Sequence, residues 1–96
     1  MTLEKDIERR LRVLVERHGG LCLKWVCPGW AGVPDRIVLL PGGRVVFVEL
    51  KQPHGKLGAL QKWWRDRLRQ LGFKCWVIWD GANLEMFEEC VLRETL

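Results

Sequence analysis

The stretch "GVPDRIVLLPGGRVVFVELKQPHGK", residues 32–56, decides the fold of this chain. Two apolar runs, residues 35–40 and 44–51, flank a Pro-Gly-Gly turn. Apolar runs joined by three residues that include glycine are typical of a β-hairpin. Three charged side chains stand near the ends of these runs: Asp35, Glu49 and Lys51.

Antiparallel pairing places the two carboxylates opposite each other. If Leu40 pairs with Arg44, counting outward from the turn brings Asp35 opposite Glu49. Side chains alternate between the faces of a strand, so Glu49 and Lys51 share a face. Directly opposed residues have Cβ atoms about 4.5–5.5 Å apart. We therefore expect the three charges to meet at one place, provided that no bulge shifts the register.

Facing carboxylates repel each other and need a proton, a nearby cation or a bound metal. Mg²⁺ typically takes one or two carboxylates, keeps several waters and accepts phosphate oxygens. Lys51 would then position or deprotonate the attacking water, or stabilise charge on the phosphate. This arrangement serves phosphodiester hydrolysis. The simpler interpretation is that the charges are solvated and that Lys51 neutralises Glu49; the spacing of all three favours an active site.

The rest of the chain predicts an α/β fold with the order αβββαβ and a short terminal helix. The predicted helices cover residues 2–18, 57–71 and 84–92, and the predicted strands cover 21–27, 35–40, 44–51 and 73–79. Thr2 can cap the first helix, and Gly72 can end the second. The apolar stripe of the second helix consists of Leu57, Leu60, Trp64, Leu68 and Leu71. Trp63 lies off that stripe, and an exposed tryptophan there indicates a subunit interface.

Composition agrees with one small domain over residues 1–96. The net charge of +4 is a weak argument for a polyanionic partner. No apolar run approaches the roughly 20 residues of a membrane span, and the charged beginning of the chain does not resemble a signal peptide. The four cysteines form no C-x-x-C pair, so we expect Cys22, Cys75 and Cys90 to be buried free thiols in a reducing cytoplasm.

Pro34-Asp35 followed by Glu49-Leu50-Lys51 resembles the signature of PD-(D/E)xK nucleases. With the hairpin around it, "GKLGALQKWW" (residues 55–64) and "LRQLGFKCWVI" (residues 68–78), the chain resembles the VRR-NUC family of virus-type replication-repair nucleases. The likeness is to the short stand-alone form of bacteriophages and bacteria. It implies a restriction-endonuclease-like core, a central mixed sheet flanked by helices, acting in DNA repair.

The resemblance also implies hydrolysis of DNA with Mg²⁺ or Mn²⁺. Asp35 and Glu49 would be metal ligands, the backbone carbonyl of Leu50 a third, and Lys51 the catalytic lysine. The family places a further glutamate on the first helix; Glu8 matches it, with Glu4 as the alternative. Without that role, Glu8 would pair with Arg12 on the helix surface.

Gln61 matches a family position on the second helix. We expect either a buried amide with a specific partner near Lys51 or a satisfied polar group at the margin of the core. Gly58 stands where the family usually has a hydroxyl residue, which would weaken the helix cap.

Side chains near the site are candidate DNA contacts. They are Arg36, His54, Lys56, Lys62 and Trp30, with Lys24, Arg65, Arg67 and Arg69 further away. Each of these charges taken alone is more simply a solvated surface group. The resemblance favours a homodimer that resolves four-way DNA junctions as a Holliday junction resolvase. The alternatives are a non-catalytic nucleic-acid-binding module on a nuclease fold and a flap, nick or single-strand nuclease.

Overall fold

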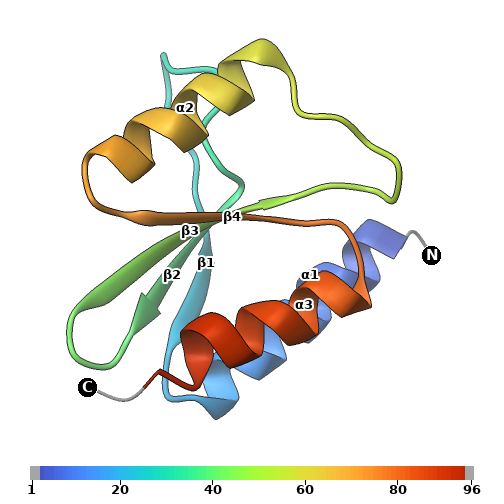
Figure 1. Cartoon of the computed structure of the whole chain (residues 1–96), viewed down its shortest axis with the longest axis vertical. Helices are drawn as coiled ribbons and strands as arrows, with labels where there is room; N and C mark the ends of the chain where they lie inside the picture. The colour runs from blue at the N-terminus through green and yellow to red at the C-terminus, as the bar shows by residue number, and fades with distance from the viewer. Residues whose placement is uncertain (1–2, 95–96) are drawn as a thin grey trace.

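A computed structural model describes residues 3–94, and four strands form one mixed sheet at its centre (Figure 1). The strands lie in the order β1 (Leu21–Lys24), β2 (Arg36–Leu40), β3 (Arg44–Leu50) and β4 (Lys74–Ile78). The first three run antiparallel to their neighbours, whereas β3 and β4 are parallel. The connection between those parallel strands contains a helix, as parallel pairing requires.

Helices cover both faces of the sheet within residues 3–94. Helix α1 (Leu3–Arg17) and helix α3 (Gly81–Phe87), which continues as a π-helical turn over Glu88–Leu92, lie on one face. Helix α2 (Ala59–Gln70) lies on the other (Figure 1). The predicted order of elements is confirmed. Thr2, the proposed cap of the first helix, lies outside the described residues.

The hairpin has the register that the sequence predicts. Leu40 pairs with Arg44, and the pairing continues without a bulge to Arg36 opposite Val48. Gly42 and Gly43 in the turn both have positive φ, at 83° and 74°, a conformation that glycine adopts at little cost.

Each face of the sheet has its own apolar core. The larger one joins α1 and α3 to the sheet through Leu11, Val15, Val48 and Phe87, all fully buried. The smaller one, beneath α2, is formed by Phe47, Leu68 and Cys75, with Trp25 and Trp64 packed against it. Burial raises the pKa of the Cys75 thiol to about 11, so this cysteine is a structural residue.

Three details differ from the predictions. Leu60 and Leu71 are each 56% exposed, because Leu68 and Gln61 mark the side of α2 that faces the sheet and Leu60 and Leu71 lie at the margins of that side. Cys90 is exposed, since it lies on the outward side of the π-helical turn. The terminal helix begins at Gly81 because Asp80 accepts a hydrogen bond of 2.9 Å from the N–H of Asn83 and caps it.

Candidate active site

Asp35 and Glu49 lie at the end of the hairpin that is far from its turn. Asp35 directly precedes β2, and Glu49 is the second-last residue of β3. The backbone N–H of Asp35 donates to Oε1 of Glu49 at 3.1 Å, and the N–H of Leu50 donates to Oδ2 of Asp35 at 2.9 Å. Each carboxylate is therefore held by the backbone of the opposite strand, which continues the pairing that the sequence predicts.

Glu49 is an acid in an unfavourable place for negative charge. Its side chain is buried, with 5% exposed, and the Asp35 carboxyl lies beside it. Burial and the hydrogen bond and charge of Asp35 raise the pKa of Glu49 from 4.5 to about 8, while the Lys51 ammonium acts in the opposite direction. At neutral pH the carboxyl pair therefore holds a proton unless a cation takes its place.

Gln61 joins α2 to this pair. Its Nε2 donates to Oε2 of Glu49 at 2.8 Å, and its Oε1 accepts from the N–H of Gly58 at 2.8 Å. The second bond orients the amide, because only the oxygen can accept from a backbone N–H. The specific partner expected for the Gln61 amide is therefore Glu49. The sequence alone did not identify which residue this partner would be. The same side chain supplies the helix cap that Gly58 lacks.

Lys51 follows β3 and extends its pairing with β4, since its N–H donates to the carbonyl of Ile78 at 3.0 Å. The side chain is half-buried, and within residues 3–94 no hydrogen bond or ion pair holds its ammonium. Its charge still lowers the pKa of Glu49, so the ammonium lies within electrostatic reach of the carboxyl pair. A cation in this position is available to a substrate phosphate.

Glu8 reaches the same region from α1. Its Oε1 pairs with Nη2 of Arg36 at 2.6 Å, so its partner is Arg36 and not Arg12. A hollow of about 230 Å³ is lined by Glu8, Lys24, Trp25, Asp35, Arg36 and Leu50. In the described part of the chain, Nε of Arg36 is buried without a hydrogen-bond partner. This arginine therefore retains an unused donor beside the carboxylates.

The donor set fits a small, hard cation. Over residues 3–94, no group of three or more His, Cys, Asp or Glu side chains is gathered closely enough to hold a metal ion. Two adjacent carboxylates are nevertheless the usual protein share of a Mg²⁺ site, which keeps waters and takes substrate oxygens for the rest. The side chain of Glu4 lies outside the description, and Glu8 stays a predicted ligand.

Four of the predicted DNA contacts lie on three segments connected to the site: the loop after Lys51, helix α2 that carries Gln61, and the loop before Asp35. His54 and Lys56 are exposed in the loop after β3, where His54 has a positive φ of 67° and the Gly55 carbonyl accepts from Nε1 of Trp79 at 3.0 Å. Lys62 is exposed on α2, and Trp30 is exposed in the loop before Asp35. Their roles stay predictions.

Trp25 is a residue that sequence reasoning did not single out. Its N–H donates to the carbonyl of Asp35 at 2.8 Å, and its side chain lines the hollow and packs against Phe47 with ring centroids 4.9 Å apart. Trp25 therefore helps to fix the backbone at Asp35. Side chains alternate between the faces of a strand, and counting from Leu21 places Trp25 on the face that α2 covers. This alternation is the sequence signal that could have identified Trp25.

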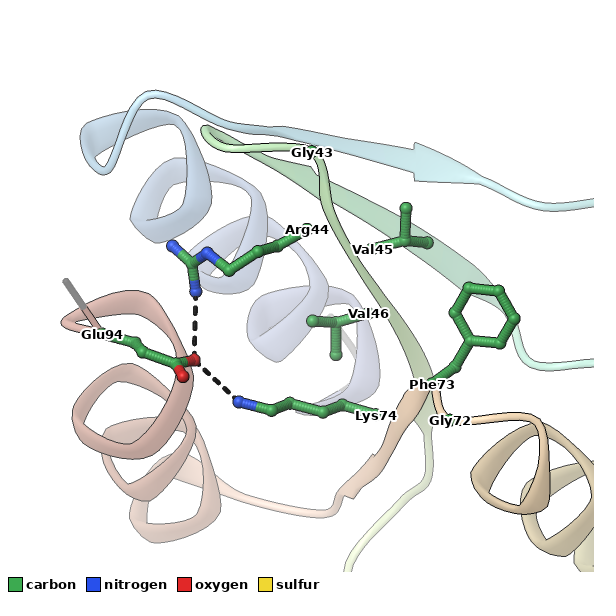
Figure 2. Close-up of a pocket in the computed structure, with 8 residues that line it drawn as sticks. All are labelled: Gly43, Arg44, Val45, Val46, Gly72, Phe73, Lys74 and Glu94. Atoms are coloured by element: carbon green, nitrogen blue, oxygen red, sulfur yellow. Dashed lines mark hydrogen bonds and ion pairs between the residues drawn. The ribbon is translucent and has the colours of Figure 1, made fainter. Parts of the chain in front are cut away.

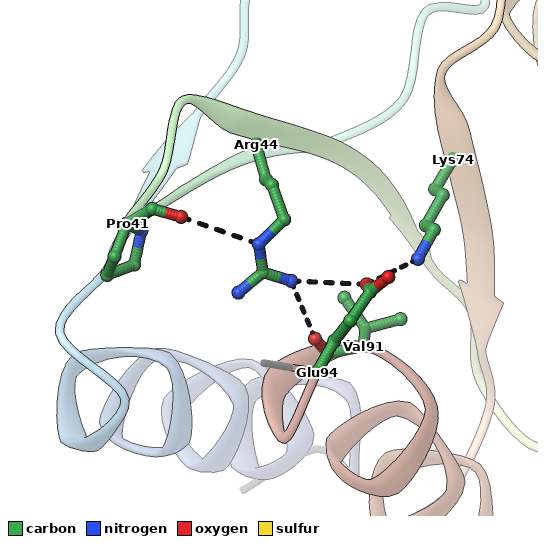
Figure 3. A network of polar contacts seen from close by, with 5 residues as sticks. All are labelled: Pro41, Arg44, Lys74, Val91 and Glu94. Atoms are coloured by element: carbon green, nitrogen blue, oxygen red, sulfur yellow. Dashed lines mark hydrogen bonds and ion pairs between the residues drawn. The ribbon is translucent and has the colours of Figure 1, made fainter. Parts of the chain in front are cut away.

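A second hollow, of about 300 Å³, lies at the other end of β3 (Figure 2). There Oε2 of Glu94 contacts both Nη1 of Arg44 at 3.3 Å and Nζ of Lys74 at 2.7 Å, and Arg44 also donates to the carbonyls of Pro41 and Val91 (Figure 3). These contacts fasten the chain after the π-helical turn to β3 and β4. Arg44 stands five residues from Glu49, roughly 16 Å along the strand, so this hollow is separate from the candidate site.

Comparison with known proteins agrees with a nuclease fold. No family model matches the chain. A solved structure described as a VRR_NUC domain superposes with a TM-score of 0.89 and 28% identity, covering 95% of this chain and 99% of the other. A curated protein named "Putative nuclease p44", from Acyrthosiphon pisum secondary endosymbiont phage 1, is 43% identical over 81 residues, covering 84% of this chain and 86% of that protein.

The mixed sheet with helices on both faces is thus the fold of a nuclease domain, and the predicted fold class is confirmed. The chain belongs to the VRR-NUC family of nucleases. None of the helices within residues 3–94 is long and apolar enough to cross a membrane.

Proposed function

We propose that this nuclease is a metal-dependent endonuclease that hydrolyses DNA phosphodiester bonds at Asp35, Glu49 and Lys51. The observation that carries the proposal is the arrangement of the two carboxyl groups. Each carboxylate accepts a hydrogen bond from a backbone N–H of the opposite strand, and the pKa of Glu49 is raised to about 8. A protein gains nothing in stability from burying such a pair, so a ligand that uses it is the better explanation.

The two carboxylates and the backbone carbonyl of Leu50 would hold Mg²⁺ or Mn²⁺, with Glu8 at the edge of the site. When bound, the ion supplies Lewis acidity toward a phosphate oxygen and lowers the pKa of a bound water. Gln61 keeps Glu49 in place through Nε2. Lys51 brings its ammonium to the phosphate, where it stabilises negative charge or orients the attacking water.

The preferred substrate is branched DNA, and the working form is a homodimer that nicks a four-way junction. A twofold dimer carries two sites with opposite orientation, which suits paired cuts in such a junction. The competing functions are cleavage of flaps, nicks or single strands, and binding without catalysis. The complete set of Asp35, Glu49 and Lys51 at one place favours catalysis, since a binding module has no need of facing carboxylates.

The test is cleavage of end-labelled DNA by the wild type and by Lys51→Ala, with Mg²⁺, with Mn²⁺ and with chelator. The substrates are a four-way junction, a flap, a linear duplex and a single strand of matched sequence. Arg17→Ala serves as the control, because it removes one exposed positive charge at the far end of α1.

Metal-dependent, symmetric nicking of the junction by wild type and control, lost in Lys51→Ala, is the expected result. Binding without cleavage under every metal condition would overturn the catalytic proposal. Equal cleavage of all four substrates would support phosphodiester hydrolysis but contradict the proposed preference for the four-way junction.

A further inference from the structure

An exposed aromatic surface lies next to the candidate site. Trp30, Leu60 and Trp63 are 61%, 56% and 52% exposed, which is unusual for such large apolar side chains. Trp64 lies between the two tryptophans, with ring centroids 5.8 Å from Trp30 and 5.2 Å from Trp63, edge to face in both cases. We call Trp30, Leu60 and Trp63 the tryptophan platform. A grouped apolar surface of this kind marks an interaction site.

The platform is held firmly. Nε1 of Trp64 donates to the carbonyl of Ala31 at 2.9 Å, which fastens the loop carrying Trp30 to α2. Gly32, with φ of 87°, lies so close to the helix that an added Cβ would come within 2.6 Å of the Leu60 Cβ. The loop is therefore docked on α2, and Trp30 is presented in a fixed position. Little conformational entropy remains to be lost when a ligand binds such a surface.

The platform adjoins the reacting groups through both of its elements. Along α2, Gln61 contacts Glu49 and Leu60 directly precedes it, while Trp63 stands about 3 Å further along the helix axis, on the opposite side of the helix from Gln61. Along the loop, Trp30 precedes Asp35 by five residues. A strand with a phosphate at the two carboxylates would place a neighbouring base within reach of the platform.

The charges around the platform select its occupant. Helix α2 carries Lys62, Arg65, Arg67 and Arg69 against a single acid, Asp66. Two copies packed together through this helix would bring like charges face to face, which is unfavourable. A nucleic acid strand offers the opposite combination, anionic phosphates for the basic side chains and flat base faces for the tryptophans.

We propose that the tryptophan platform stacks unpaired nucleobases of the DNA strand that is cut, so that the enzyme selects DNA with unpaired bases beside the scissile phosphate. The inference rests on the proposed function, because it places the bases relative to a phosphate at Asp35 and Glu49. Fully paired duplex keeps its bases stacked on one another and cannot use the platform. Flaps and single strands can, and so can a branch point at which base pairs have opened.

The experiment measures binding of a fluorescent oligothymidylate and of a matched duplex at fixed ionic strength, by anisotropy. All proteins carry Lys51→Ala and are assayed with Mg²⁺, so that binding is measured without cleavage. The test variants are Trp30→Ala and Trp63→Ala; Trp30→Phe should restore stacking. Leu71→Ala is the matched control, since Leu71 is equally exposed but stands at the opposite end of α2.

Each alanine variant should weaken single-strand binding by at least about fivefold and change duplex binding by less than twofold, as expected for the loss of one stacked base. Leu71→Ala and Trp30→Phe should bind like the parent protein. Unchanged single-strand binding in both alanine variants, or parent protein that binds the single strand no better than the duplex, would overturn the proposal. A Trp63→Ala variant that dissociates a dimer in light scattering, with DNA binding intact, would assign the surface to a subunit contact.

The same substitutions without Lys51→Ala separate this inference from the proposed function. If the tryptophan platform stacks unpaired bases, the alanine variants lose cleavage of the flap or junction but keep any metal-dependent cleavage of linear duplex. If wild type cuts nothing with any metal while the tryptophans still govern single-strand binding, the catalytic proposal fails and the stacking surface stands.

Discussion

Gln61 donates a hydrogen bond of 2.8 Å from Nε2 to Oε2 of Glu49, and this contact ties the second helix to the strand that carries the predicted catalytic residues. The amide cannot turn away, because its oxygen is held by the N–H of Gly58. Helix α2, which also carries Leu60 and Trp63 of the tryptophan platform, is therefore coupled directly to a predicted metal ligand. A hydrogen bond from a neighbouring side chain to a metal-binding carboxylate orients the carboxylate and tunes its basicity.

Gln61→Leu removes this hydrogen bond and leaves Glu49 without its side-chain partner from α2. Loss of such a partner typically costs 10- to 100-fold in metal affinity or activity, and we expect a decrease of that order in the cleavage rate at limiting Mn²⁺. A Mn²⁺ titration of cleavage measures it. Gln70→Leu, on the last turn of the same helix, is the control and should match wild type. Equal activity of Gln61→Leu and wild type across the titration would show that the contact is only structural.

The acid pair makes metal-free stability depend on pH. The pKa of Glu49 is about 8 in the folded protein and near 4.5 in the unfolded chain, so the folded state holds more protons between these values. The free energy of unfolding therefore falls as pH rises from about 4.5 to 8, by at most about 1.4 kcal/mol per pH unit from this group. Urea unfolding in chelator at pH 5 and pH 8.5 measures the fall.

Glu49→Gln is the variant that isolates this effect, because its amide cannot ionise. It should lose less stability than wild type between the two pH values and be the more stable protein at pH 8.5. Glu85→Gln, an exposed glutamate on α3, should follow the wild type. A wild type and Glu49→Gln with the same pH dependence would contradict the raised pKa.

The hairpin could be predicted from the sequence because its register depends on local features. A three-residue turn with two glycines sets the pairing of Leu40 with Arg44, and the absence of a bulge carries this pairing unchanged to Asp35 and Glu49. The period-two pattern then fixes which side chains share a face. The central part of the candidate site follows from these facts alone.

The contacts that sequence reasoning did not find are tertiary. The partner of Glu8 depends on how α1 crosses the sheet, and that packing brings it to Arg36 instead of Arg12 on its own helix. The exposure of Leu60 depends on how α2 is rotated about its axis above the sheet, which helical periodicity does not contain. Predicting the hydrogen bond from Gln61 to Glu49 likewise requires knowledge of the angle between α2 and β3.

A divalent metal should stabilise the folded protein through Asp35. At a free Mn²⁺ concentration of 100 times the dissociation constant, ligand binding adds about 2.7 kcal/mol to the free energy of unfolding. Asp35→Asn should abolish this gain and leave the metal-free fold intact, because the amide oxygen can still accept from the N–H of Leu50. Thermal melts with and without Mn²⁺ measure it, and Asp66→Asn, an exposed acid on α2, is the control. An equal metal-induced shift in wild type and Asp35→Asn would place the metal elsewhere.

The ion pair of Glu8 with Arg36 predicts how two substitutions on α1 should differ. Glu8→Gln removes a carboxylate that lines the same hollow as Asp35. If Glu8 supports the metal, the cleavage rate should fall by about tenfold or more, which is the usual effect of losing an outer-sphere carboxylate. The stability cost should stay below about 1 kcal/mol, because the Glu8 side chain is 43% exposed and such pairs contribute little. Arg12→Ala, four residues along the helix, should leave both quantities unchanged, since Glu8 pairs with Arg36. Cleavage rates and urea midpoints of the two variants measure this. If Glu8→Gln cuts at the wild-type rate at limiting metal, Glu8 is an anchor for Arg36 and takes no part in the reaction.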